Sequence, residues 1–224
     1  ATDALGHTAT SDLTTFTVAA PPATITLSGI IRDFKIEHPD FEYVISDDDG
    51  IVKNTLGADK NPIYNGNPTT TTTTGLVNFN QWYNHVNSIN KCTTNAITLT
   101  RSTAGIYSYS NTAFFPIDGQ LFGNEGKPHN YHFTYEIHAT FTYQPGQTIT
   151  LTGDDDIWVF IDNKLALDQG GVQPPRTGTI NLDDPSLGLV AGQTYEFALF
   201  FAERHTVQSN LGISTNIEFT PLTP

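Results

Sequence analysis

The 224-residue sequence has a single cysteine, Cys92, and no methionine. One cysteine excludes an intrachain disulfide, so we expect a free, buried thiol. The sequence also lacks a signal peptide and any apolar run long enough to cross a bilayer, and we expect it to be a segment of a longer protein. Basic residues are few: 10 Lys and Arg stand against 23 Asp and Glu, a net charge of −13. Nucleic acids and anionic membranes require basic patches, so this balance argues against both as partners.

Threonine and aromatic residues are abundant, which is typical of an extracellular β-protein. Residues 132–143 alternate strictly, which predicts a strand with one buried apolar face and one exposed polar face that carries Glu136 and His138. We expect further strands at residues 24–31, 97–100, 106–109, 147–151, 164–167, 195–201 and 212–219, and a short helix within residues 79–86. Many strands separated by turn signals predict an all-β fold, a two-sheet antiparallel β-sandwich with long loops and at most one or two short helices.

The first 22 residues differ from the rest of the sequence. They resemble the end of an immunoglobulin-like extender repeat followed by a stiff linker at Pro21-Pro22, and an added edge strand of the main domain is the alternative. The main domain then covers residues 23–224. Within it, the six-threonine tract at 69–74 is expected to be an exposed excursion. Residues 47–49, three aspartates, lack the glutamate that closes an EF-hand loop, so we expect a solvated loop rather than an ion site.

Three more consecutive aspartates, Asp154, Asp155 and Asp156, directly precede the apolar run at residues 157–161. A run that is apolar at every position indicates a strand covered on both faces. Carboxylates crowded at the mouth of such a strand repel one another, so we expect a hard divalent cation with oxygen ligands, Ca2+ first among them. The alternative is a solvated acidic turn.

Several uncommon motifs occur here in the order in which the fibro-slime domain has them. They are GIIRDF at 29–34, HPDF at 38–41, FPIDG at 115–119, HFTYE at 132–136, TGDDD at 152–156 and FAERHT at 201–206. The sequence from about residue 24 to 220 therefore resembles the fibro-slime branch of the anthrax protective-antigen lectin-like domain family, whose members are β-sandwiches.

The resemblance implies a particular site. In lectin members of the family, two adjacent aspartates joined by a cis peptide bond bind one Ca2+, which places that pair on Asp154-Asp155, with Asp155-Asp156 as the alternative register and Asp156 as the alternative metal ligand. A second loop completes the shell, and it corresponds to residues 205–210. The implied metal ligands are Asp154, Asp155, Gln208, Ser209 and Asn210, and the implied sugar contacts are Asp154, Asp155, His205 and Gln208. For Asp118, Glu203 and the pair at 183–184 we expect hydrogen bonding within loops or a second structural Ca2+ rather than sugar contact.

The implied function is Ca2+-dependent sugar binding by a module of a large secreted adhesin of the RTX type, acting in cell adhesion and biofilms on a bacterial surface. A partly dehydrated Ca2+ replaces the water around two vicinal hydroxyls, so sugars of the fucose, glucose and mannose type are the expected ligands and an isolated module is expected to be a monomer. The alternative is a spacer in which Ca2+ only rigidifies the sandwich. An enzyme is not expected, because adjacent aspartates do not face each other across a cleft as glycosidase carboxylates do, and no HExxH motif or nucleophile elbow occurs.

Overall fold

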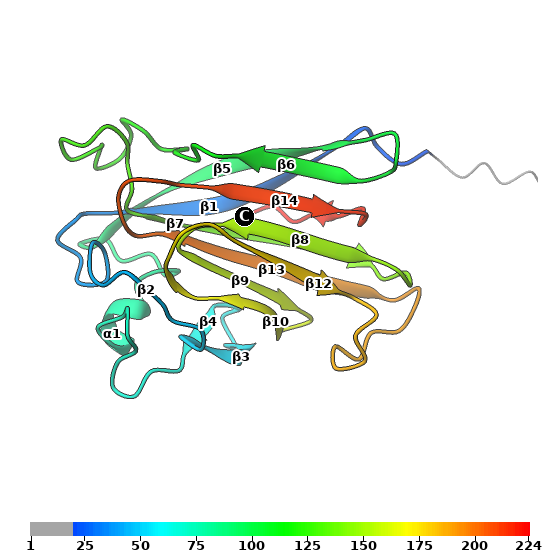
Figure 1. Ribbon diagram of the computed structural model, residues 1–224, viewed down its shortest axis with the longest axis horizontal. Coiled ribbons are helices and arrows are strands. Elements are labelled where there is room, and N and C mark those ends of the chain that lie inside the picture. Colours follow the sequence, from blue (N-terminus) through cyan, green and yellow to red (C-terminus); the bar gives the residue numbers. More distant parts are fainter. Residues whose placement is uncertain (1–19) are drawn as a thin grey trace, which may run out of the picture.

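The computed structural model describes residues 20–224 (Figure 1). The expected extender strand within residues 1–22 lies almost wholly outside the described residues, so it stays a prediction. The elements are β1 (Thr24–Phe34), β2 (Ser46–Asp47), β3 (Val52–Leu56), β4 (Pro62–Tyr64), α1 (Leu76–Phe79), β5 (Asn90–Arg101), β6 (Tyr107–Asn111), β7 (Phe133–Thr142), β8 (Thr148–Gly153), β9 (Asp156–Ile161), β10 (Lys164–Gln169), β11 (Gly171–Val172), β12 (Arg176–Asn181), β13 (Thr194–Glu203), β14 (Leu211–Thr215) and β15 (Thr220–Pro221).

The predicted all-β sandwich is confirmed. One antiparallel sheet runs in the order β12-β8-β14-β6-β5-β1-β7-β13-β9-β10-β3-β4 and curls so that its two halves face each other (Figure 1). The main core lies between the halves, because alternate side chains from both enter one hydrophobic cluster, such as Leu151 of β8 and Leu199 of β13. Burial of this apolar surface provides most of the folding free energy.

Strand β9 is covered on both faces, as its unbroken apolar run predicts. Ile157, Val159 and Ile161 point into the main core, whereas Trp158 and Phe160 belong to a second hydrophobic cluster on the outer side of the sheet. That second cluster consists largely of side chains from residues 51–83, which we call the covering segment. The unbroken apolar run of β9 therefore indicates a strand that packs between two hydrophobic clusters.

The alternation predicted for β7 is only partly correct. Its apolar side chains, from Phe133 to Phe141, are all buried in the main core. The opposite face is not the solvated polar face that we expect from the sequence, because Thr134 is fully buried and Glu136 is nearly so. The Thr134 hydroxyl donates to the Trp82 carbonyl at 2.5 Å, and Glu136 pairs with Arg32 at 2.9 Å. The covering segment that buries β9 also reaches this face.

Four further expectations need correction. The helix is a single turn at Leu76–Phe79 and ends where the predicted helix begins. The threonine tract is not an exposed excursion, since Thr72 and Thr73 are buried. It donates hydrogen bonds to carboxylates, two of them from Thr72 to the half-buried Asp48. The closing strand ends at Thr215, whereas the sequence predicts that it continues to residue 219. Cys92 is free, as predicted, but it is only half-buried.

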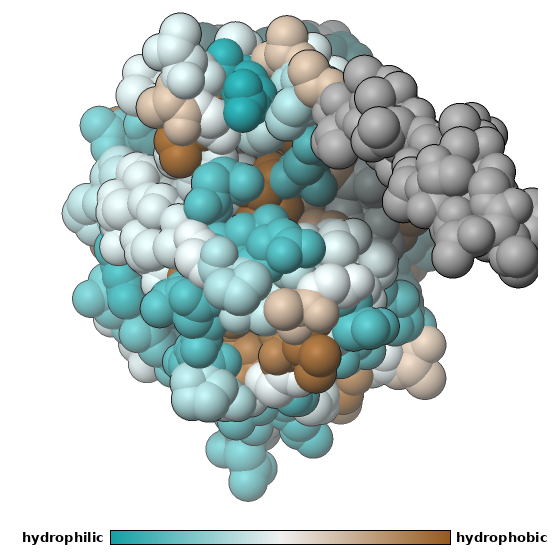
Figure 2. Space-filling model, turned by 90° about the vertical axis from the view of Figure 1, so that its right-hand side faces the viewer, coloured by the Kyte–Doolittle hydropathy of each residue, from teal (hydrophilic) through white to brown (hydrophobic). Residues whose placement is uncertain are grey.

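The two ends of the sandwich differ. Loops that join distant strands gather at the end near β2 and α1 in Figure 1, and the β8–β9 turn and the chain after β13 reach the same end. The opposite end, which faces the viewer in Figure 2, is mainly hydrophilic with small, separate hydrophobic patches. No helix among the described residues is long and apolar enough to cross a membrane.

Gly29 gives a test of this packing. It lies in the middle of β1, where a Cβ atom would meet the backbone carbonyl oxygen of Glu136 and the side chains of Tyr135 and Ile137. We expect Gly29→Ala to lower the free energy of unfolding by about 3 kcal/mol, because backbone cannot move aside as a flexible side chain can. Urea denaturation measures this, with Gly212→Ala of β14 as the control, since a Cβ there meets only ordinary contacts beyond 3.4 Å. Equal stability of the two variants would contradict the register of β1 on β7.

Candidate functional site

The aspartate triplet forms the buried turn between β8 and β9. Asp154, Asp155 and Asp156 expose only 4%, 4% and 0% of their surface, so the alternative of a solvated acidic turn is wrong. The turn is tight, and Asp155 at its centre has a left-handed φ of 54°. Each of the three carboxylates has different hydrogen-bond partners, and those partners determine which carboxylates can bind a ligand.

Asp156 is neutralised from within the protein. The Arg204 guanidinium donates to both of its oxygens, at 2.5 and 3.1 Å, and the Gly171 backbone N–H donates at 2.7 Å. Burial raises the pKa of Asp156 to about 6, while Arg204 opposes that rise. Asp156 is absent from the lining of the pocket described below. Its hydrogen bonds favour a structural role over the alternative metal role.

Asp155 holds the loop after β13. Its Oδ2 atom accepts the backbone N–H groups of Arg204 at 2.6 Å and His205 at 3.0 Å. Burial raises the pKa of Asp155 to about 8, although the Arg204 charge lowers it. Asp154 is held by Asn210, whose backbone N–H and side-chain amide each donate at 2.5 Å. Both aspartates thus tie the β8–β9 turn to residues 204–210.

The loop that the resemblance implies does lie beside the aspartates. Asp154, Asp155, His205 and Gln208 line one pocket of about 180 Å³, together with Ile45, Val172, Gln173, Pro174, Thr206 and Val207. Two of the implied metal ligands are placed differently: Asn210 is engaged with Asp154, and Ser209 is fully buried. The structure therefore brings together the four implied sugar-contacting residues at one opening.

Glu203 is a member of this cluster whose role the sequence does not reveal. Its two carboxylate oxygens and the Ser209 hydroxyl are buried and find no hydrogen-bond partner among the described residues. Burial, reinforced by the Asp155 and Asp154 carboxylates, raises the pKa of Glu203 well above its usual range. Of the two roles expected for Glu203, hydrogen bonding within a loop is not found, and a second structural Ca2+ stays a prediction. Hydrogen bonding within a loop does describe Asp118, which accepts the Asn130 backbone N–H, and Asp183, which accepts the Tyr143 hydroxyl.

The carboxylates at this site suit a cation by charge and donor type. Asp154, Asp155 and Glu203 are buried close together, and the nearby guanidinium of Arg204 is already paired with Asp156. The pocket lining includes the Asp154 and Asp155 carboxylates, and carboxylate oxygens are ligands that Ca2+ prefers. The side chains are not gathered as in a finished metal centre, however, since the described residues contain no group of three or more His, Cys, Asp or Glu arranged to hold a metal ion.

The predicted cis peptide bond in the triplet is wrong for this structure. Among the described residues, cis bonds occur at Asn67–Pro68 and Thr206–Val207 and in neither bond of the aspartate triplet. Asp155 instead takes the left-handed conformation, which turns the chain between its two neighbours.

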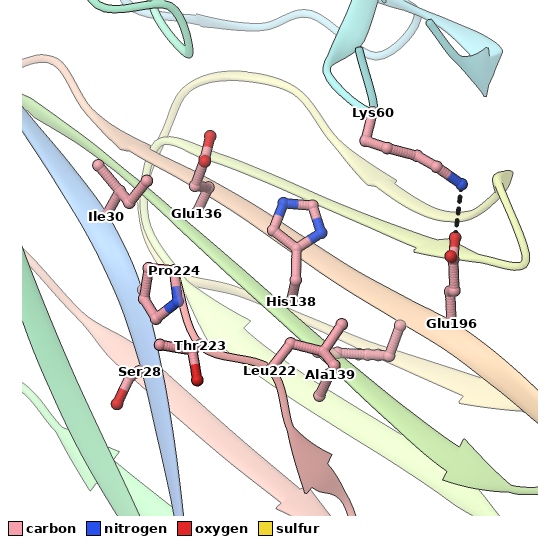
Figure 3. Close-up of a pocket in the computed structure, with 12 residues that line it drawn as sticks. Ser28, Ile30, Lys60, Glu136, His138, Ala139, Glu196, Leu222, Thr223 and Pro224 are labelled. Carbon is pink, nitrogen blue, oxygen red and sulfur yellow. Dashed lines mark hydrogen bonds and ion pairs between the residues drawn. The ribbon is translucent and has the colours of Figure 1, made fainter. Parts of the chain in front are cut away.

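A second pocket, of about 280 Å³, lies on the outer face of β1, β7 and β13 (Figure 3). It contains Glu136 and His138, but its charges are paired within the protein. Lys60 contacts Glu196 at 2.7 Å, as the dashed line in Figure 3 shows, and Glu136 pairs with Arg32. Burial lowers the pKa of His138, which favours its neutral form. This pocket therefore offers no free charge to a polar ligand.

Comparisons with known proteins show what the chain is similar to. Residues 117–222 match the PA14 domain family model. Protein psiD of Dictyostelium discoideum is 40% identical over 207 residues, which are 86% of this chain and 40% of that protein, so the chain spans less than half of this curated relative. Two similar solved structures are a PA14 sugar-binding domain from an RTX adhesin (10% identical, 42% of this chain and 52% of that chain, TM-score 0.29) and the PA14 domain of the MpAFP antifreeze protein (7% identical, 88% and 85%, TM-score 0.38). The resemblance to the protective-antigen family is confirmed by the match of residues 117–222 to the PA14 domain model.

Proposed function

We propose that this chain is a Ca2+-dependent carbohydrate-binding module. The observation that carries the proposal is the shared pocket of Asp154, Asp155, His205 and Gln208, which come from two distant segments and meet beside an unbalanced cluster of buried carboxylates. A bound Ca2+ would displace the protons that burial retains on these carboxyls, would balance the resulting charge, and would accept hydroxyl oxygens as ligands. The proposed metal ligands are Asp154 and Asp155 with an oxygen of Gln208, because Ser209 and Asn210, which the resemblance also implies, do not line the pocket.

The remaining polar groups of the pocket would orient the sugar. Gln208 is exposed at the opening and can both donate and accept hydrogen bonds, while His205 is half-buried beside it. Vicinal hydroxyls of fucose, glucose or mannose type sugars fit this description, because each sugar presents two oxygens at a fixed spacing. A pocket of this size holds one ring, so each site binds weakly, and adhesion would require many copies.

We place the module outside the cell, as part of a larger adhesive protein that meets cell-surface glycans. The acidic composition supports this placement, since it disfavours nucleic acids and anionic membranes. We propose no catalytic role for the module and a monomeric state when it is isolated. The bacterial surface and the RTX and biofilm context remain predictions of the sequence, because psiD, which aligns over 86% of this chain, comes from Dictyostelium discoideum.

One observation favours a second candidate, a structural spacer. Glu203 lies buried rather than at the opening, so an ion held between Glu203 and Asp154 would be closed off by protein. Such an ion would rigidify the β8–β9 turn and the loop after β13 without offering a position to a sugar. Both candidates predict that Ca2+ binds. Only the open site predicts that a sugar then binds as well.

The experiment is a panel of monosaccharides titrated calorimetrically, in Ca2+ and again in EGTA. The proposed function predicts that several sugars with vicinal diols bind in Ca2+ only. If Ca2+ raises the melting temperature and no sugar binds, the spacer is correct instead. Sugar turnover on long incubation with the protein would contradict the non-enzymatic assignment.

The pH dependence gives a further prediction. A carboxyl whose folded pKa is raised binds a proton that Ca2+ must displace, so Ca2+ affinity rises with pH up to the folded pKa. Because the pKa of Asp155 is raised from 3.8 to about 8, we expect Ca2+ affinity to rise about tenfold between pH 6 and pH 7 and to level off above pH 8. Without Ca2+ the same shift makes stability fall as pH rises from about 4 to about 8. Calorimetry in two buffers of different ionisation enthalpy measures the released protons, and a pH-independent affinity would contradict the prediction.

A further inference from the structure

An exposed apolar strip lies at the rim of the proposed site. Tyr43, Val44 and Ile45 are consecutive and expose 50%, 36% and 65% of their surface, and Val207 exposes 74%. Three consecutive exposed apolar residues are uncommon in a soluble domain unless they serve a function. We call these four residues the apolar strip.

The backbone under the strip is fixed at both ends. At one end the Glu42 backbone N–H donates to the Arg204 carbonyl at 2.8 Å, and the Glu42 carboxylate accepts the Thr206 backbone N–H at 3.1 Å. At the other end Ser46 pairs with Val172 where β2 meets β11. The segment therefore runs along the loop after β13 and forms a wall of the pocket. Ile45 and Val207 both line the opening.

The strip and the pocket offer different chemistry side by side. The pocket presents the Asp154 and Asp155 carboxylates and the Gln208 amide, whereas the strip presents alkyl groups and one phenol ring. A second sugar of a glycan chain would place hydroxyls on the strip and lose hydration without gaining hydrogen bonds. An alkyl or aryl group in that place would gain from burial instead. A continuous surface of this kind matches a ligand with a polar head and an apolar attachment.

We propose that the module prefers sugars that carry an apolar aglycone, as glycolipids and aryl or alkyl glycosides do, with the sugar in the pocket and the aglycone on the apolar strip. The proposal rests on the proposed sugar-binding function. No described residue packs over the strip, and the other exposed apolar side chains, such as Val190, do not line this pocket.

The test compares methyl and hexyl glycosides of mannose and glucose, which share a head group and differ in the aglycone. We expect the hexyl glycoside to bind about tenfold more tightly than the methyl glycoside in Ca2+, a difference of 1.4 kcal/mol. Ile45→Ser and the double variant Tyr43→Ser with Val44→Ser should bring this ratio close to one. Val190→Ser removes an equally exposed apolar side chain elsewhere and should leave the ratio at about ten. A phenyl glycoside and a glycolipid in vesicles distinguish aryl, alkyl and lipid sources of the same chemistry.

The outcomes separate this proposal from the proposed function. If methyl and hexyl glycosides bind equally in Ca2+, the aglycone proposal is overturned and sugar binding stands. If neither binds, both are overturned. If binding of the hexyl glycoside persists in EGTA, the strip binds alkyl chains without the sugar and the aglycone proposal fails.

Discussion

Replacing Asp155 by asparagine is expected to weaken Ca2+ affinity on the order of 100-fold and to abolish Ca2+-dependent sugar binding, while the protein stays folded. The reason lies in the two tasks of this carboxylate. Oδ2 accepts the backbone N–H groups of Arg204 and His205, and the side chain also lines the pocket. An asparagine oxygen can still accept those N–H groups, so the loop after β13 keeps its position, but the negative charge is lost.

The choice of substitution matters for the interpretation. Asp155→Ala would leave two buried N–H groups without an acceptor, at about 1–3 kcal/mol each, so lost binding could then reflect a displaced loop. Asp155→Asn removes the negative charge but keeps an acceptor for the two N–H groups, so the loop after β13 stays in place. Asp183→Asn is the matched control, since Asp183 accepts hydrogen bonds from Tyr143 and Gly146 in a loop that does not line this pocket. Calorimetry with Ca2+ and then with sugar measures both affinities, and wild-type sugar binding by Asp155→Asn would contradict the proposed function.

Local patterns in the sequence predict the sandwich well. The alternation of β7 and the apolar run of β9 depend on short-range periodicity, and both strands occupy the predicted places. The covering segment was not predicted, because a threonine tract gives no apolar signal. Its burial depends on carboxylates far away in sequence, as when Thr74 donates to Asp40. Such long-range pairing also buries Thr134 on the β7 face that we expected to be exposed.

The sequence predicts where the site lies in the chain, but it does not predict which residues contact each aspartate. Three identical aspartates in a row are indistinguishable in sequence, and only a distant arginine separates Asp156 from its neighbours in the structure. Arg204 lies within the FAERHT motif, yet no sequence pattern reveals that its side chain turns inward. The sequence does not predict Ile45 at the pocket or the burial of Glu203 beside the aspartates, since both depend on how loops from different strands meet.

The buried Arg204–Asp156 pair yields the second large prediction. Arg204 exposes none of its surface, and besides Asp156 its guanidinium donates to the Thr72 carbonyl at 2.7 Å and lies 4.7 Å from the Trp82 ring. Arg204→Met keeps similar bulk but leaves Asp156 buried without its counter-charge. We expect a loss of about 3–5 kcal/mol in the free energy of unfolding at pH 8, because an uncompensated buried charge costs far more than the pair contributes. The loss should be smaller at pH 5, where Asp156 can bind a proton.

A double-mutant cycle in urea, without Ca2+, tests that account. If the cost comes from the stranded charge, adding Asp156→Asn to Arg204→Met should restore about 2 kcal/mol or more at pH 8. Arg176→Met is the matched control, because Arg176 pairs with Asp49 on the surface and should lose at most about 1 kcal/mol. If the double variant is as unstable as Arg204→Met alone, Arg204 acts through its contacts with Thr72 and Trp82 instead. The backbone N–H of Arg204 also donates to Asp155. If the double variant regains stability, the ion pair between Arg204 and Asp156 therefore explains why Asp156 is occupied within the protein while Asp154 and Asp155 remain available at the pocket.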